Sequence, residues 1–272
     1  MVSPTEYSTD LPPVVFHEKE VESDGFLVKF LEAGQGSSVV ILDTATWSIS
    51  KLHSSLAQKY HVIAIELPGF GSSPENTGSR SAQDIAGTIT QALAKIASEK
   101  HTLIGTSFGA NVALWQTLQA PNSVEALILI SPTCLMPTGG MIDATPADMA
   151  ERLFAHPEDA RCLPTYDADM VAKELFLAQR LGSENHDTEA ELRLIEIRCA
   201  TLVVFGSQDK LVSSEAASIY RVKLPNCNVS IVYDAGHAIL AERPEALIST
   251  VLDYVERRET FVVGNQSRVI NP

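Results

Sequence analysis

The sequence predicts an α/β protein: a doubly wound, mostly parallel sheet of eight strands, with a helical lid inserted into it. Three observations carry this prediction, namely recurring short apolar runs, helical patterns between them, and one long stretch without a strand. Continuous β-branched runs are typical of strands that are buried on both faces, as in a parallel sheet. Strands that alternate with helices indicate a doubly wound sheet.

Two runs near the start alternate apolar and polar residues, and they predict an antiparallel pair split by Ser23-Asp24-Gly25. Six more continuous runs follow them along the chain. The eight predicted strands are residues 14–17, 26–31, 38–42, 61–65, 102–104, 126–130, 201–205 and 229–233.

Apolar residues at helical spacing predict one helix from Asp84 to Ala97 and another from Pro244 to Val255. Ser81 is expected to cap the first of these helices, with Asp84 at its third position as a variant capping box. These helices separate predicted strands, as the doubly wound arrangement requires.

No convincing strand lies between Ile130 and Thr201, and the helical stretches there predict an inserted lid. Its apolar face either packs on the main domain or lines a pocket, and the sequence leaves both open. The predicted helices are 146–154, 169–180 and 188–197; the expected divisions are a core of 1–134 and 199–259, a lid of 135–198 and a tail of 260–272.

The pentapeptide Gly105-Thr106-Ser107-Phe108-Gly109 is the most informative motif of the chain. It follows a predicted strand and precedes a predicted helix, which is the setting of a nucleophile elbow. Such a turn leaves no room for side chains at its flanks, holds its serine in a strained conformation and points a helix N-terminus at any anion formed there. The same pattern also occurs in ordinary strand-to-helix turns.

A serine hydroxyl needs an adjacent base, and the base needs an orienting carboxylate. Asp209 follows the predicted strand 201–205, and His237 follows the predicted strand 229–233. Because the carboxyl ends of parallel strands meet at one edge of a sheet, we expect Ser107, Asp209 and His237 to lie together. Asp209 as a simple loop carboxylate, and His237 as a packing residue, are the alternatives.

These motifs together resemble the α/β-hydrolase superfamily over almost the whole chain, to about Arg257. The resemblance implies that Ser107 is the nucleophile, that His237 is the general base and then the general acid, and that Asp209 orients the imidazole. It also implies that the backbone N–H of Phe108 is one oxyanion donor and that no cofactor is needed. The matching segments are 66–73, 105–109, 206–212 and 235–237, followed by 242–245.

The loop after the third predicted strand departs from the family pattern, which has His-Gly and further glycines there. Asp43 and Thr44 occupy these positions, and no glycine follows. By position Ala45, or Thr44, would supply the second oxyanion N–H, and a β-branched threonine restricts the aim of that donor. Asp43 either opposes an oxyanion or faces away and bonds to the backbone.

The departure leaves three functions open. The first is a serine hydrolase for a small, largely apolar ester, lactone or carbonyl-activated C–C bond. The second is a non-hydrolytic relative, a lyase or a cofactor-independent oxygenase, and the third is a small-molecule receptor that retains the triad. An apolar pocket is suggested by large side chains in the lid and loops, although packing of the lid explains them equally well. The expected substrate-binding residues are Thr44, Trp47, Leu135, Met136, Phe154, Phe176 and Leu240.

Composition excludes several partners. With 34 acidic and 20 basic residues the net charge is −14, which disfavours nucleic acid and anionic membrane surfaces. No stretch approaches the roughly 20 apolar residues of a membrane span. Histidines and carboxylates lack metal-ligand spacing, so no metal is expected. The expected ligand is therefore a small-molecule substrate.

The start of the chain lacks the basic and apolar regions of a secretory signal, and no cysteines form a C-x-x-C pair. We therefore expect a cytoplasmic protein with reduced thiols. The tail from Thr260 to Pro272 has an apolar start, and it covers a sheet edge, docks on the partner subunit of a homodimer or is unstructured.

Overall fold

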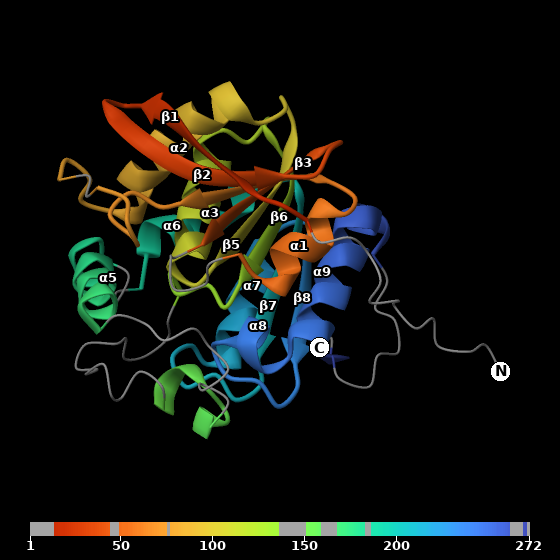
Figure 1. The fold of residues 1–272 in the computed structure, drawn as a ribbon. Helices are drawn as coiled ribbons and strands as arrows, with labels where there is room; N and C mark the ends of the chain where they lie inside the picture. Colours follow the sequence, from red (N-terminus) through yellow and green to blue (C-terminus); the bar gives the residue numbers. More distant parts are fainter. Residues whose placement is uncertain are drawn as a thin grey trace.

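The computed structural model describes residues 14–43, 49–74, 77–135, 151–158, 168–182, 186–261 and 269–270. Nine strands within these ranges form one sheet in the order β1-β2-β4-β3-β5-β6-β7-β8-β9. Helices cover both faces of this sheet (Figure 1). The predicted fold class, a mostly parallel, doubly wound sheet, is confirmed, with β9 as an addition at the edge.

Neighbouring strands from β3 to β8 run parallel to one another, whereas β1, β2 and β9 are joined by antiparallel pairs. The strands are β1 (His17–Ser23), β2 (Phe26–Ala33), β3 (Ser38–Asp43), β4 (His61–Glu66), β5 (His101–Thr106), β6 (Val124–Ile130), β7 (Ala200–Gly206), β8 (Cys227–Val232) and β9 (Val269–Ile270). The helices are α1 (Lys51–Ala57), α2 (Ala82–Ile96), α3 (Phe108–Gln119), α5 (Ala168–Arg180), α6 (Thr188–Arg193), α7 (Ala217–Lys223), α8 (Ile239–Glu242) and α9 (Pro244–Arg257), with the 3-10 turns η3 (Leu194–Glu196), η4 (Ser214–Ala216) and η5 (Arg258–Thr260).

The first strand was predicted at residues 14–17, and this prediction is wrong. β1 begins at His17 and ends at Ser23, where Ser23 pairs with Phe26 across a tight turn. Asp24 and Gly25 both have positive φ values, 54° and 73°, which a two-residue hairpin turn requires. The turn therefore fixes the register of β1 against β2. An edge strand leaves one of its sides in water, so the polar segment before the turn can form this strand.

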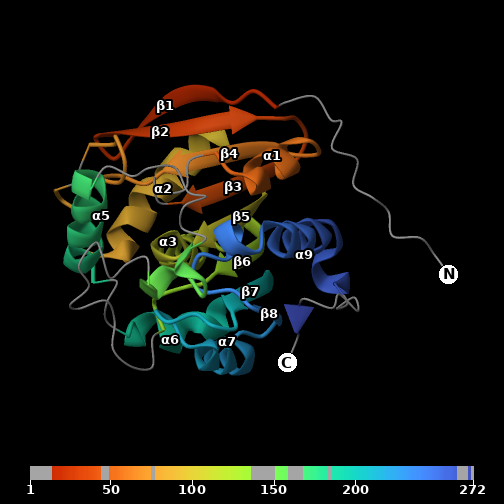
Figure 2. The same cartoon turned by 60° about the horizontal axis from the view of Figure 1, so that its bottom comes forward.

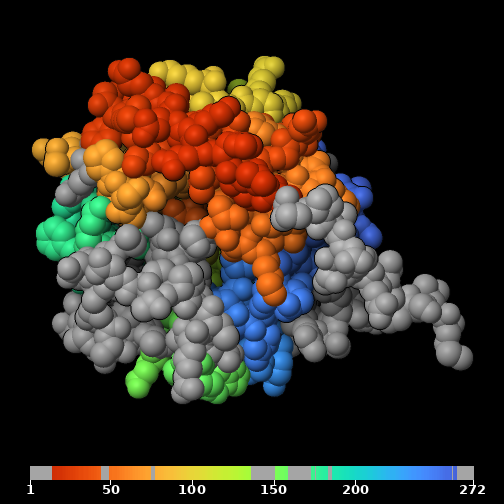
Figure 3. All heavy atoms as spheres, viewed as in Figure 1, coloured from red at the N-terminus to blue at the C-terminus, as the bar shows by residue number. Residues whose placement is uncertain are grey.

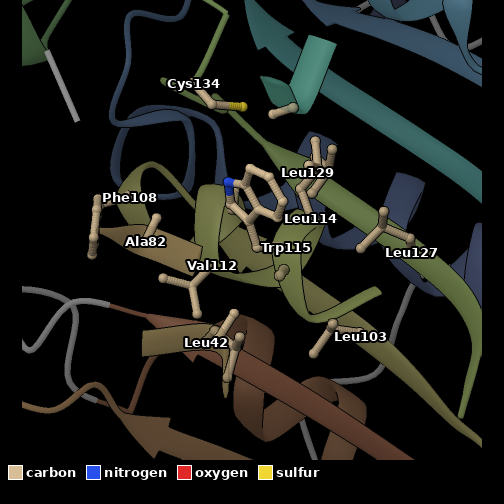
Figure 4. Close-up of a cluster of buried hydrophobic side chains, with 14 of the residues drawn as sticks. Leu42, Ala82, Leu103, Phe108, Val112, Leu114, Trp115, Leu127, Leu129 and Cys134 are labelled. Carbon is tan, nitrogen blue, oxygen red and sulfur yellow. The ribbon is translucent and has the colours of Figure 1, made fainter. Parts of the chain in front are cut away.

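Two apolar clusters lie on opposite faces of the sheet. Helices α2, α3 and α7 bury their apolar side chains on one face, and α1 and α9 bury theirs on the other. Figure 2 shows these two helical layers from a second direction. Figure 4 shows part of the first cluster, to which Leu42 of β3, Trp115 of α3 and Leu127 of β6 contribute side chains. The buried helix α3 is thereby held rigidly against the strands that end near it.

The cap predicted for α2 is confirmed. The Ser81 hydroxyl accepts the N–H of Asp84 at 3.2 Å, and the Asp84 carboxylate accepts the N–H of Arg80 at 2.8 Å. The carboxylate thus reaches one residue before the cap, where the usual capping box would place it on the cap residue itself.

The chain between β6 and β7 contains helices and loops in its described parts. The predicted helices at 169–180 and 188–197 are confirmed as α5 and as α6 with η3. Residues 151–153 are helical, and the earlier part of the third predicted helix lies outside the described residues. The exact lid limits, 135–198, remain a prediction.

β9 places Val269 and Ile270 against β8, the last of the parallel strands. These two residues cover an edge of the sheet, whereas the role of the apolar start of the tail stays a prediction, because residues 262–263 lie outside the described residues. Homodimer formation remains a prediction.

The strand order reverses at β3, which lies between β4 and β5. In doubly wound sheets, the crevice outside the carboxyl ends of the strands at such a reversal is the usual ligand site. Ser107 follows β5 directly, so the fold positions the elbow at this point.

Candidate active site

Ser107 lies in the strained turn that the sequence predicts. Its backbone has φ 52° and ψ −118°, between the end of β5 and the start of α3. Its N–H donates to the carbonyl of Ile130 at 2.9 Å, which ties the turn to β6. Strain of this kind persists only when the surroundings enforce it.

Both flanking glycines are required by close backbone contacts. A Cβ atom at Gly105 would lie 2.5 Å from the carbonyl oxygen of Gly109, and one at Gly109 would lie 2.1 Å from that of Leu42. The end of β3 therefore passes directly beside the first turn of α3. Phe108 is the first residue of α3, and the first N–H groups of a helix have no partner within it. These groups are suited to an oxyanion formed at Ser107.

The imidazole of His237 lies between Ser107 and Asp209. Its Nε2 is 2.9 Å from the Ser107 Oγ, and its Nδ1 is 2.9 Å from the Asp209 Oδ2. The structure thus brings the three predicted catalytic side chains into one hydrogen-bonded chain. With Nδ1–H donating to the carboxylate, Nε2 is the acceptor for the serine hydroxyl proton.

The acid and the base are shielded from water. The side chains of His237 and Asp209 are 2% and 0% exposed. Asp209 Oδ1 accepts the N–H groups of Leu211 at 2.8 Å and Val212 at 2.9 Å, while Oδ2 faces the imidazole. Both carboxylate oxygens are therefore satisfied, and the carboxylate is held in one orientation.

Ser131 is a supporting residue that the sequence analysis missed. It is fully buried with φ 46°, and its hydroxyl donates to the carbonyl of His237 at 3.2 Å. Its position directly after the β6 run was a usable signal, since β6 lies next to β5 in the sheet.

The predicted substrate-binding residues have different surroundings. Leu135 and Phe154 are buried, Leu240 is half-buried, and Phe176 on α5 is 64% exposed. Their contact with substrate stays a prediction. Thr44, Ala45, Trp47 and Met136 lie outside the described residues, so the second oxyanion donor also stays a prediction.

Asp43, at the end of β3, lines a cavity of about 360 Å³ together with His53 and Glu66. The two orientations considered for Asp43 from the sequence both stay predictions. In the described ranges, no group of three or more His, Cys, Asp or Glu side chains is arranged to hold a metal ion. No helix in these ranges has the length and apolar character needed to cross a membrane.

A mostly parallel sheet with a serine elbow after β5, facing an imidazole and a carboxylate from later strands, defines an α/β hydrolase. The chain belongs to the alpha/beta hydrolase family, whose model matches residues 36–250.

Named relatives are similar over most of this chain. The 2-hydroxy-6-oxononadienedioate/2-hydroxy-6-oxononatrienedioate hydrolase 2 of Pseudomonas putida is 25% identical over 263 residues, covering 83% of this chain and 90% of that protein. The dihydrolipoyllysine-residue acetyltransferase component of the acetoin cleaving system of Cupriavidus necator is 26% identical over 251 residues. That match covers 81% of this chain and 64% of the relative, so the chain spans less than two thirds of its length.

Solved structures share the fold. The 2-hydroxy-6-oxo-6-phenylhexa-2,4-dienoate hydrolase from Rhodococcus sp. strain RHA1 superposes with a TM-score of 0.73 and 19% identity. The superposition covers 89% of this chain and 99% of that one.

Proposed function

We propose that this chain is a serine hydrolase that cleaves a small, largely apolar ester, lactone or carbonyl-activated C–C bond. The observation that carries the proposal is the pair of 2.9 Å contacts that link Ser107, His237 and Asp209. A hydroxyl, an imidazole and a buried carboxylate in this order form the arrangement that activates serine for attack on a carbonyl.

In the first half of the reaction, the Ser107 Oγ attacks the substrate carbonyl carbon while its proton passes to His237 Nε2. The Asp209 carboxylate stabilises the resulting imidazolium through Nδ1–H. The tetrahedral oxyanion accepts the N–H of Phe108 at the start of α3, where the helix dipole adds to the attraction. Collapse of the intermediate expels the leaving group, which takes the proton from His237.

In the second half, water attacks the acyl-enzyme. His237 removes a proton from the water, and the acid product leaves as Ser107 recovers its proton. A second backbone donor from residues 44–45 would complete the oxyanion site, and the loss of one such donor costs about 3–4 kcal/mol of transition-state stabilisation. The efficiency of the enzyme therefore depends on that loop.

The names of several relatives, the Pseudomonas putida protein among them, favour cleavage of a C–C bond next to a carbonyl. The Pseudomonas putida relative is named as a hydrolase of 2-hydroxy-6-oxononadienedioate, and the match covers 90% of its length. In this variant of the reaction, the carbon leaving group takes the proton. Ester, lactone and C–C cleavage all place the same oxyanion next to Phe108.

A substrate panel tests the proposal. It contains p-nitrophenyl esters of short acids, simple lactones and a 2-hydroxy-6-oxo-dienoate, each assayed with the parent protein and with Ser107→Ala. We expect turnover that is lost in Ser107→Ala. Cleavage of the dienoate alone would narrow the function to C–C hydrolysis. Thermal stabilisation by panel compounds without any turnover would instead contradict the proposal and support a receptor.

A further inference from the structure

Residues 151–156 of the inserted segment contact both loops that carry the acid and the base. We call this segment the brace. It lies beside α8 at the carboxyl edge of the sheet, where its green ribbon and spheres adjoin the blue residues that follow β8 (Figure 1, Figure 3). The brace is therefore next to the triad although it belongs to the insertion between β6 and β7.

The backbone of the brace packs directly on the loop of His237. The N–H of Ala238 donates to the carbonyl of Leu153 at 2.9 Å. A Cβ atom at Gly236 would lie 2.6 Å from the N of Ala155 and 2.7 Å from the carbonyl oxygen of Leu153. The residues on both sides of His237 thus touch the brace, and only glycine fits at position 236 without a shift of the backbone.

Glu242 joins the same two segments with one carboxylate. Its Oε2 accepts the N–H of Gly236 at 2.6 Å, and its Oε1 accepts the N–H of His156 at 3.0 Å. The residue is 7% exposed. A buried carboxylate that accepts one N–H from each of two segments fixes their separation, because moving either segment leaves a buried charge short of a partner.

The acid loop is attached to the brace by a different residue. Lys210 directly follows Asp209, and its Nζ donates to the carbonyls of Glu151 at 3.1 Å and Phe154 at 3.3 Å. The brace therefore connects the loop of Asp209 to the loop of His237, in addition to the direct contact between those two side chains.

We propose that the brace sets the spacing of the acid and base loops, and that Glu242 is a positioning residue that holds His237 in line with Ser107. This inference rests on the proposed function, because it assigns Glu242 a role through His237. A displacement of about 1 Å in a reacting group lowers a rate by on the order of 10²-fold, so a small movement of this loop is measurable.

Two variants of Glu242 separate position from charge and from folding. Glu242→Gln keeps the size but turns an NH₂ group toward one of the two N–H donors. Glu242→Asp keeps the charge but is one methylene too short to reach both donors. Glu245→Gln is the control, since Glu245 lies three residues further on in an exposed ion pair with Lys51.

The readout is the second-order rate constant for modification of Ser107 by a fluorophosphonate, measured from pH 5 to pH 9 at a temperature where each variant is folded. We expect Glu242→Gln and Glu242→Asp each to lower the rate constant about tenfold or more, with Glu245→Gln unchanged. A normal rate in Glu242→Asp would show that the charge of residue 242, and not its contact with both N–H donors, determines the reactivity of Ser107. A normal rate with a smaller reactive fraction in both variants would assign it to folding. Either result would overturn the inference.

Amide hydrogen exchange tests the brace without using reactivity. In Glu242→Gln we expect faster exchange at Gly236 or His156, whichever faces the NH₂ group and loses its acceptor, and also at Ala238, whose acceptor Leu153 belongs to the brace. Faster exchange confined to Gly236 or His156 would contradict a brace. If Ser107 of the parent protein does not react at all, the proposed function fails, while the exchange result still decides whether the brace exists.

Discussion

The Nε2 atom of His237 lies 2.9 Å from the Oγ atom of Ser107, although 130 residues separate them in sequence. The strands that precede them, β8 and β5, are not neighbours, because β6 and β7 lie between them. The loop after β8 must therefore extend across two strand ends to reach the serine. Ser131, which follows β6, holds the carbonyl of His237 on this path.

Asp209→Asn should leave the fold intact and lower kcat by about 10³–10⁴-fold. The amide oxygen can still accept the N–H groups of Leu211 and Val212, which places the NH₂ group against His237 Nδ1. The imidazole then carries its proton on Nε2, where it faces Ser107 and cannot accept the hydroxyl proton. Steady-state kinetics measures this loss of kcat, with Asp253→Asn as the control. A decrease in kcat of less than tenfold would contradict the role of Asp209 in orienting His237.

Two glycine-to-alanine variants should have opposite effects on stability. Gly109→Ala places a methyl group 2.1 Å from the Leu42 carbonyl oxygen, which should cost about 3 kcal/mol or more. Gly87→Ala, inside α2, has only the side chain of Gln119 within 4 Å, at 3.9 Å, and should add about 0.5–1 kcal/mol. Urea denaturation measures both, and equal effects would refute the close packing of β3 on α3.

His156 should make stability depend on pH above neutrality. A hydrogen bond from its ring to Asp234 at 2.7 Å raises the pKa of His156 and lowers that of Asp234. Because the folded pKa of His156 exceeds the unfolded value of about 6.5, this contribution is complete below that value and is lost as pH rises through the folded pKa.

The variant His156→Gln tests this dependence. Its unfolding midpoint should fall further below that of the parent at about pH 6 than at a pH above the folded pKa of His156, where the parent has lost the charged pair. His17→Gln, at an exposed position on β1, controls for the loss of a surface histidine. A difference from the parent that is equal at both pH values would contradict the assignment.

His53 should make the stability of the protein depend on pH in the acid range. Its contribution is lost as pH falls, whereas that of His156 is lost as pH rises. Burial lowers its pKa to about 4, and the N–H of Ser50 donates to its Nδ1 at 3.2 Å. The neutral ring contributes stability above the unfolded pKa, and this is lost as pH falls from about 6.5 through about 4, in total on the order of 3 kcal/mol. His53→Gln, which keeps an acceptor for Ser50, should flatten the stability curve in this range. An unchanged slope in urea titrations would show that other groups dominate.

The sheet was predictable because its central strands are buried on both sides. Val203 and Val204, which point to opposite faces of β7, are both 0% exposed. A continuous β-branched run is therefore the direct mark of such a strand. β1 was misplaced because an edge strand lacks this constraint, and a turn of only two residues decides its register.

The triad was predictable because each member follows a recognisable strand, and strand ends meet at one edge. The contacts that support the triad were not predictable. Glu242 belongs to the segment 242–245 that matches the family, but nothing in the sequence shows that its carboxylate spans Gly236 and His156. Such contacts depend on the path of loops whose residues have no periodicity.

The most direct test of the account is the reaction of the protein with a fluorophosphonate, followed by digestion and mass spectrometry. We expect one adduct on Ser107, formed at a rate that falls by on the order of 10³-fold or more in His237→Ala, because the hydroxyl then has no base. An unmodified Ser107, or an equal rate of modification in His237→Ala, would contradict the claim that His237 activates Ser107.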